Sequence, residues 1–289
     1  MALQHKIETF LIEGSPYGLR YHDLSNWIGR IFFTPRTSFS ELLKREEMAK
    51  PGVYILVGSP EENALPTVYI GEADVLQNRL RSHVQKDFWD EVIVCIAKDD
   101  TLDKAGVRYI ESKLVVRAQQ DKLCDVENSV NPATNYLSEA NTAVMDQFIE
   151  NMIFMLPLVG LRIIRTDIQD KSTQSDNPLL TCDQDGIKAT GRDTDEGFIV
   201  YKGSTARKIV FDSFSESSKQ LRSKLIETSV LVDHPQNNDV LLFEQDYVFS
   251  SPSGASGMIL GVTSNGRWKW KTPNGTSLKD FQENNLPKI

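Results

Sequence analysis

The sequence contains little cysteine and little histidine, with three cysteines and four histidines among 289 residues. Cys95, Cys124 and Cys182 are odd in number and scattered, and none belongs to a CxxC pair. This set argues against a disulfide scaffold and against a cysteine-rich zinc site, and it fits a reducing cytosol. We therefore expect a cytoplasmic protein.

Long apolar runs are also missing. The most apolar stretch, residues 148–164, is interrupted by Glu150, Asn151, Pro157 and Arg162, so it predicts no membrane span. The first residues contain no apolar core of the kind that a signal peptide carries. The chain also lacks a phosphate-binding loop, a dinucleotide fingerprint and a His-x-x-x-His zinc pair.

An excess of basic residues is missing as well, because the chain has a formal net charge of −8. Residues 51–136 hold 9 Lys and Arg against 14 Asp and Glu, and residues 137–195 hold 5 against 10, so each segment has a net charge of −5. Residues 1–50 and 196–289 each have a net charge of +1. Non-specific, tight binding to nucleic acid by bulk electrostatics is therefore not expected.

Residues 52–83 are the segment around which the chain is organised. Alternation predicts one strand beginning Gly52-Val53-Tyr54 and a second through Tyr69-Ile70-Gly71, joined by turn-rich residues as an antiparallel hairpin. In this hairpin the two tyrosines lie side by side on the face opposite the aliphatic residues. A short helix then begins near residue 75 and places Arg79 and His83 on one stripe.

A buried carboxylate is predicted on the next helix. The apolar run 92–96 is typical of a central strand, and residues 99–119 predict a helix whose apolar stripe includes Glu111. A carboxylate on the buried side of a helix is costly unless it is paired or bound to metal. The residues alone leave both alternatives open, an ion pair with a nearby arginine or a metal ligand.

Four features follow one another in the chain: the triplet Gly52-Val53-Tyr54, the triplet Tyr69-Ile70-Gly71, the arginine of the short helix, and Glu111. In this order they resemble the GIY-YIG nuclease family over about residues 51–136. The resemblance implies an α+β fold, an α/β sandwich in which a small, mainly antiparallel sheet is flanked by helices. It also implies a metal-dependent endonuclease that hydrolyses phosphodiester bonds in DNA with Mg²⁺ or Mn²⁺. RNA stays open as a substrate, and no membrane partner is implied.

The same resemblance assigns the site residues. Glu111 would hold the metal and Arg79 would stabilise charge on the phosphoryl oxygens, while Tyr54, with Tyr69 beside it, would act as the general base or orient the water. His83 is the alternative base. Further residues with a structural or substrate-contacting role would be Gly52, Gly71 and Glu72. Several family members carry a polar or basic residue at the position of Glu72. An asparagine would also help to hold the site together, and Asn128 is the first candidate for it and Asn131 the second.

The remaining chain predicts several further elements. Residues 7–12 and 31–33 predict strands, and Ser38 with Glu41 has the form of a capping box for a helix to about residue 48. Ser138 predicts the start of a helix with Val144, Phe148, Met152 and Met155 on its apolar side, and 161–164 favours a strand. We expect an N-terminal extension (1–50), a nuclease-like domain with the following helix (51–165), a polar linker (166–194) and a C-terminal domain (195–289).

The C-terminal segment is similar to domains of unknown function that recur fused to GIY-YIG nucleases and resemble modules of restriction and modification proteins. We expect a smaller α+β domain in which residues 266–271 form a strand with Trp268 and Trp270 on one face. Its role would be a contact with a protein partner, and the association favours a bacterial setting in repair, restriction or phage defence. The alternative function is a non-catalytic adaptor that binds DNA or protein on the same fold.

Overall fold

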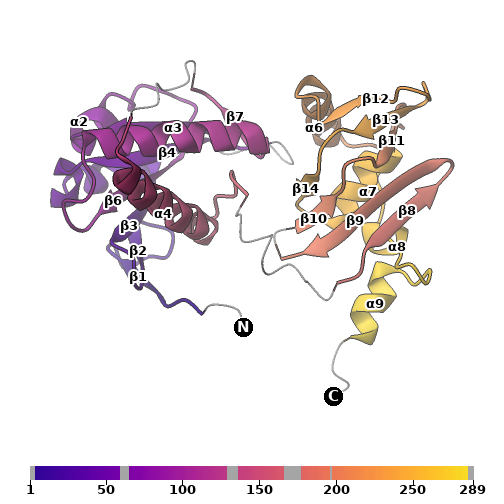
Figure 1. Cartoon of the computed structure of the whole chain (residues 1–289), viewed down its shortest axis with the longest axis horizontal. Helices are drawn as coiled ribbons and strands as arrows, with labels where there is room; N and C mark the ends of the chain where they lie inside the picture. The colour runs from indigo at the N-terminus through magenta and orange to yellow at the C-terminus, as the bar shows by residue number, and fades with distance from the viewer. Residues whose placement is uncertain (1–3, 59–64, 129–135, 166–176, 196, 286–289) are drawn as a thin grey trace. The chain divides into compact units, whose positions relative to one another are not determined.

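A computed structural model describes residues 4–58, 65–128, 136–165, 177–195 and 197–285. The protein is mixed α+β, and its described residues divide into two compact units. The N-terminal unit comprises the described residues up to Arg165, and the C-terminal unit comprises those from Asn177 onward. Figure 1 shows the helices and strands of the two units, and each unit has its own hydrophobic core.

The N-terminal unit is built on a seven-stranded sheet in which every neighbouring pair is antiparallel except β5 and β7. The strand β6 occupies the centre, as its continuous apolar run predicts. The strands, in their order across the sheet, are β1 (Ile7–Leu11), β2 (Arg20–Leu24), β3 (Gly29–Pro35), β6 (Glu91–Ala97), β4 (Gly52–Gly58), β5 (Thr67–Ala73) and β7 (Asp125–Val126).

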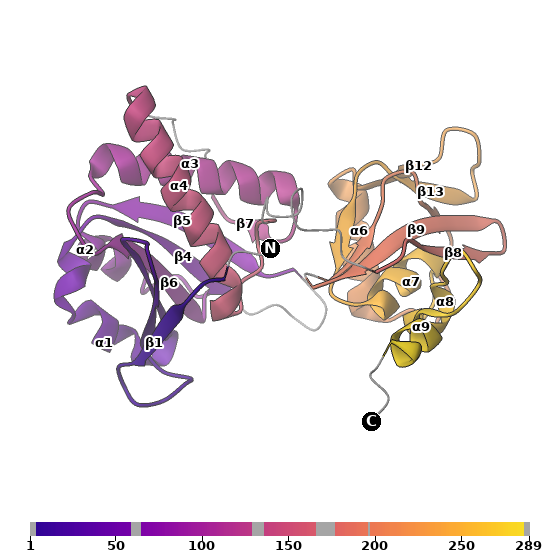
Figure 2. The same cartoon turned by 60° about the horizontal axis from the view of Figure 1, so that its bottom comes forward.

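Helices cover both faces of this sheet, because successive side chains of each strand point to opposite faces. The aliphatic residues of β4 pack with α3 (Lys104–Asp121) and α4 (Glu139–Met155). Tyr54 and Leu56 pack on the other face with α1 (Phe39–Leu43) and α2 (Leu76–Arg81). Figure 2 shows these two helix pairs on either side of the strands.

The helix α4, continued by the 3-10 turn η3 (Leu156–Val159), is long and apolar enough to cross a membrane by length and composition. Its side chains Met145, Phe148 and Met152 are buried in the core against α3 and the sheet. A core helix of a soluble protein meets the same criterion. The packing of α4 accounts for its apolar composition without a membrane.

Residues 1–50, which the sequence presents as an extension, supply β1, β2 and β3 to the same sheet as the hairpin. The sequence does not predict β2, whose residues are mostly polar. The predicted helix over 38–48 is wrong, because α1 spans five residues between the 3-10 turns η1 (Arg36–Ser38) and η2 (Glu46–Ala49). The Ser38 hydroxyl donates to the Glu13 carboxylate at 2.8 Å and does not cap α1.

Two further expectations for the N-terminal unit are corrected. Residues 161–164 form no strand; they follow the left-handed Gly160 as a buried irregular segment. Ser138 caps α4 as expected, but Val144 is exposed, and Met145 is the buried residue at this level of the helix. Met145 packs against Gly106 of α3, so the contact between the two helices sets the buried face of α4.

The C-terminal unit contains two antiparallel sheets and the helices α6 to α9. The larger sheet has the order β14-β10-β9-β8, and the smaller one has the order β11-β13-β12. The strands are β8 (Leu180–Gln184), β9 (Ile187–Thr194), β10 (Gly197–Val200), β11 (Thr205–Arg207), β12 (Leu231–Asp233), β13 (Val240–Phe243) and β14 (Tyr247–Phe249), and the helices are α6 (Glu216–Glu227), α7 (Pro252–Leu260), α8 (Gly266–Lys269) and α9 (Leu278–Asn284).

Two expectations for this region are wrong. Residues 180–194 form the hairpin β8–β9 rather than a linker, because Leu180, Cys182 and Ile187 are buried inside an otherwise polar sequence. Residues 266–269 form the helix α8, whose N-terminus is capped by Asn265, rather than a strand. The two tryptophans therefore do not share a face: Trp270 is fully buried, whereas Trp268 is 50% exposed.

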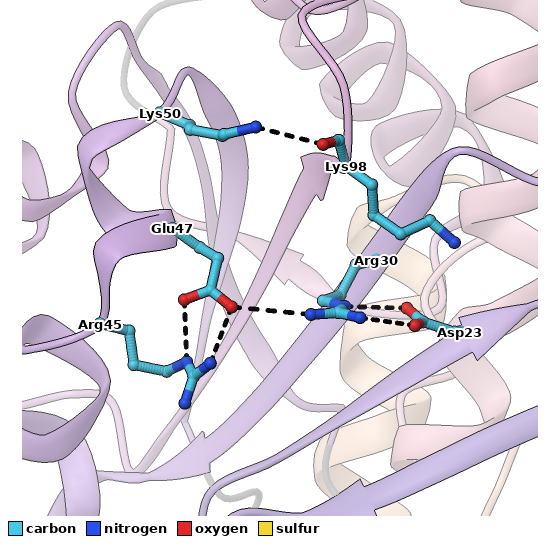
Figure 3. Close-up of polar contacts among 6 residues, drawn as sticks. All are labelled: Asp23, Arg30, Arg45, Glu47, Lys50 and Lys98. Atoms are coloured by element: carbon cyan, nitrogen blue, oxygen red, sulfur yellow. Dashed lines mark hydrogen bonds and ion pairs between the residues drawn. The ribbon is translucent and has the colours of Figure 1, made fainter.

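A chain of charged side chains ties the first strands to η2 (Figure 3). Arg30 on β3 donates to both carboxylate oxygens of Asp23 on β2, at 2.7 and 2.9 Å. The Glu47 carboxylate lies 3.6 Å from Arg30 and accepts two hydrogen bonds from Arg45. These side chains are only 18–29% exposed, so their paired charges are partly desolvated.

Replacing Arg30 with methionine should therefore leave two carboxylates without their shared cation. We expect the free energy of unfolding of the N-terminal unit to fall by about 2 kcal/mol, measured by urea denaturation. The matched control is Lys44→Met, which breaks the exposed pair with Glu41 and should change the stability by less than about 0.5 kcal/mol. Equal losses of stability in the two variants would contradict a special role for the partly buried ion pairs of Arg30.

Candidate active site

The hairpin β4–β5 brings two tyrosines together on one face of the sheet. Tyr54 lies opposite Gly71, and Leu56 lies opposite Tyr69, so the tyrosines are diagonal neighbours whose ring centroids are 6.3 Å apart. Glycine is needed at position 71, since a Cβ there would lie 2.3 Å from the Tyr54 hydroxyl. Gly71 thus leaves room for the hydroxyl end of the Tyr54 side chain.

Four side chains from β4, β5, α2 and the turn after α2 form one hydrogen-bonded cluster. The Tyr54 hydroxyl lies 2.7 Å from His83 Nε2 and accepts from Arg79 Nε at 3.2 Å. Arg79 Nη2 donates to the Tyr69 hydroxyl at 3.3 Å. Tyr54 and His83 are buried, Tyr69 is half-buried and Arg79 is exposed. The cluster therefore runs from the core to the surface.

Both buried members of the cluster are neutral at neutral pH. Desolvation raises the pKa of the Tyr54 phenol above its ordinary value. Desolvation, together with the positive charges of Lys86 and Arg79, lowers the pKa of His83 to about 4. Since Tyr54 already accepts from Arg79, we assign its proton to the bond with His83 Nε2, and His83 Nδ1 has no partner among the described residues.

The turn that carries His83 is held in place from two directions. The Trp89 indole donates to the His83 carbonyl at 3.0 Å. Arg36 donates to the carbonyls of Val84, Lys86 and Trp89 at 2.8–2.9 Å. These contacts fix residues 83–89 against the first strands of the sheet, so the position of His83 does not depend on its own helix alone.

The carboxylate of Glu111 faces the same region from α3. It is half-buried within the apolar stripe of that helix, and it accepts a hydrogen bond from the backbone N–H of Glu72. Desolvation and the nearby Glu72 carboxylate raise its pKa to about 7, while Arg79 and Arg108 act in the opposite direction. Arg108 also donates to Glu72 at 3.4 Å.

This arrangement could hold a hard cation through a single protein ligand. In the part of the chain that the structure describes, no group of three or more His, Cys, Asp or Glu is placed to bind a metal. Mg²⁺ accepts such a site, because it keeps several waters and takes one or two carboxylates together with substrate phosphate. The Glu72 carboxylate lies close enough to act on Glu111, and two neighbouring carboxylates are the oxygen donors that such an ion takes, so the residues fit it.

The other predicted residues lie at different distances from the cluster. Asn128 bonds both backbone groups of Ile70, at 3.1 and 2.7 Å, and thereby fixes the strand between Tyr69 and Gly71. Asn131 lies outside the described residues. Gly52 packs against Leu76 of α2 and the Cys95 carbonyl, so its contacts are with the scaffold rather than with the cluster.

Sequence reasoning missed Arg36, Lys86 and Trp89. Arg36 lies almost fifty residues before the turn whose carbonyls it binds, and no local pattern links the two. Lys86 lies with its Nζ 4.0 Å from the centre of the Tyr69 ring. The local sequence around Arg36 and around Trp89 contains no pattern that predicts these contacts.

The buried carboxylate predicts a pH-dependent stability. Between pH 4.5 and about 7, Glu111 ionises in the unfolded chain before it does so in the folded one, which destabilises the metal-free fold at higher pH. Glu111→Gln should therefore stabilise the protein at pH 8 in EDTA by on the order of 1 kcal/mol, allowing for solvent screening. This gain in stability should vanish below pH 4.5, where Glu111 is protonated in both states. At pH 8, excess Mg²⁺ should reduce or reverse the gain, because the ion binds the folded wild-type protein and stabilises it. Thermal unfolding at the two pH values tests this; an equal gain at both would contradict it.

A second prediction concerns Gly71. Gly71→Ala should displace the Tyr54 ring and lower the free energy of unfolding by on the order of 1–3 kcal/mol, measured by chemical denaturation. The control is Gly254→Ala in α7, where the added Cβ meets nothing closer than 3.4 Å and the expected change is within about 0.5 kcal/mol. A neutral Gly71→Ala would mean that the hairpin can relax around Tyr54.

Comparison with known proteins assigns a family only to the C-terminal part of the chain. Residues 180–282 match the model of a domain of unknown function, DUF4357. No curated protein and no solved structure was found to match the chain. The matched residues lie beyond the tyrosine cluster, so the C-terminal segment contains a domain similar to others of unknown function.

Proposed function

We propose that the N-terminal unit is a metal-dependent endonuclease of the GIY-YIG type that hydrolyses phosphodiester bonds in DNA. The observation that carries this proposal is the convergence of Tyr54, Tyr69, Arg79 and His83 in one cluster, with Glu111 facing the same region. A purely structural cluster would not need an exposed arginine whose guanidinium is held by two tyrosine hydroxyls. The proposal includes the finer fold assignment, the GIY-YIG fold.

In this proposal Glu111 holds a divalent cation, with Glu72 close enough to add charge. When bound, Mg²⁺ or Mn²⁺ would polarise the phosphate and stabilise the leaving oxygen. Arg79 contributes a second positive charge, and its two hydrogen bonds to tyrosines fix the guanidinium before substrate arrives. Such pre-organised charge is an effective way to stabilise a phosphoryl group that gains negative charge.

Tyr54 and His83 together supply a path for a proton. The raised pKa of Tyr54 makes the phenol a poor base alone. With His83 Nε2 as acceptor, the Tyr54 hydroxyl can take the proton of an attacking water while it passes its own proton to the imidazole. The pKa of His83, about 4, leaves the imidazole unprotonated at neutral pH, so its Nε2 lone pair is free for this proton.

A second candidate function is a non-catalytic adaptor that binds DNA or protein. The observation in its favour is charge, since residues 51–136 have a net charge of −5 and the cations Lys104, Arg108 and Arg117 lie in ion pairs with carboxylates. The intact cluster favours the nuclease over this adaptor. The C-terminal unit would then supply a contact with a protein partner in either case, in a setting of repair, restriction or phage defence.

The test is nicking of supercoiled plasmid with Mg²⁺ or Mn²⁺ and with EDTA. We expect wild type to nick only with metal, and Glu111→Gln and Arg79→Ala each to reduce the rate by at least about 100-fold, since each removes a group that stabilises the transition state. The matched control is Arg81→Ala, which removes an exposed arginine from the same helix and should keep the rate within about twofold.

The outcomes separate the two functions. Absence of cleavage by wild type on plasmid, branched DNA and RNA alike would favour the adaptor. Activity that persists in Glu111→Gln would contradict the assignment of the metal ligand, and a rate reduced as much in Arg81→Ala as in Arg79→Ala would contradict a specific role for Arg79. Cleavage of RNA but not of DNA would keep the chemistry and change the substrate.

A further inference from the structure

Lys86 is a second cation beside the candidate site. Its Nζ lies 4.0 Å from the centroid of the Tyr69 ring, while the Tyr69 hydroxyl accepts from Arg79. Lys86 and Arg79 both lower the pKa of His83 through their charge, so both cations lie near the buried imidazole. Tyr69 is thus flanked by a guanidinium at its hydroxyl and by an ammonium over its ring.

Lys86 has no carboxylate partner within the described residues, unlike three cations of α3. Lys104 pairs with Asp74 at 2.7 Å, Arg108 pairs with Glu72 at 3.4 Å and Arg117 pairs with Glu150 at 2.5 Å. The charges of these three cations are neutralised in this way. A lysine that is held on an aromatic ring instead keeps its charge and its three donors available to a ligand.

The backbone of Lys86 is positioned before any ligand arrives. Its carbonyl accepts from Arg36 Nη1 at 2.8 Å, and its N–H donates to the His83 carbonyl at 3.0 Å. Arg36 is itself stacked over the Trp89 ring, with the guanidinium carbon 4.4 Å from the centroid. The ammonium therefore extends from a fixed turn, which reduces the entropy lost when it binds.

We propose that Lys86 binds a phosphate of the nucleic acid next to the phosphate that Arg79 contacts. The inference rests on the proposed function and adds a substrate-binding residue outside the motifs that the sequence analysis singled out. Two cations on either side of Tyr69 would hold consecutive phosphates of one strand and set its register on the site. In a segment whose net charge is −5, this local pair supplies the grip that bulk charge does not.

The test is binding of a short fluorescent DNA duplex in EDTA, measured by anisotropy at several salt concentrations between about 50 and 200 mM. Lys86→Met keeps the apolar stem on Tyr69 and removes the charge, so the slope of log K against log salt should fall in magnitude by about 0.9. The affinity gap between wild type and this variant should accordingly shrink about threefold over that range. Lys86→Arg keeps the charge and should keep the slope.

The matched control is Lys113→Met, which removes the same charge from another lysine packed on a tyrosine, Tyr109, at 5.3 Å. Lys113 is exposed on α3 and should leave the slope unchanged. In plasmid nicking, Lys86→Met should raise KM far more than it lowers kcat, because the lost contact is made in both ground and transition states.

The possible results distinguish this inference from the nuclease itself. Wild-type nicking together with an unchanged slope and KM in Lys86→Met would overturn the role of Lys86 and leave the nuclease standing. If the slope of log K against log salt falls in Lys86→Met but wild type does not nick, the result would support the phosphate contact and count against the nuclease. An equal fall of this slope in Lys113→Met would overturn the inference, since the salt dependence would then not be specific to Lys86.

Discussion

The hydrogen bond between the Tyr54 hydroxyl and His83 is the contact on which the candidate site depends. It lies in the core, where an unpaired phenol or imidazole nitrogen would cost free energy, so it fixes the turn after α2 relative to β4. Gly71 makes room for the hydroxyl, and Arg79 completes its hydrogen bonding. Because both ring groups are neutral, the bond stabilises the fold without burying a charge.

The segment that follows the first strands of the sheet supports the candidate site. Arg36 follows β3 directly and binds three carbonyls of residues 84–89, which carry Lys86 and follow His83. Asn128 acts similarly on the other side, by fixing β5 between Tyr69 and Gly71. Hydrogen bonds from these two distant side chains hold the backbone beside Lys86 and Tyr69 in place. Such support is what a site that works by positioning and charge requires.

Prediction from the sequence succeeded where the local period was strong. The hairpin 52–73, the central strand 91–97 and the helix bearing Glu111 all lie where alternation or helical spacing indicates. It failed where tertiary contacts override the local pattern: Ser38 bonds Glu13 instead of capping a helix, and Asn265 caps a helix where alternation of Trp268 and Trp270 favours a strand. The strands of 180–194 were missed because their buried residues are spaced among polar ones.

The sequence by itself determined the hairpin and the half-buried place of Glu111, because each follows from a period of two or of 3.6. Only the tertiary structure decided that Tyr54 pairs with His83, that Glu72 lies beside Glu111, and that Arg36 holds the turn of Lys86 against Tyr69. These contacts join residues far apart in the chain, and their geometry depends on strand register and helix packing, which no local pattern encodes.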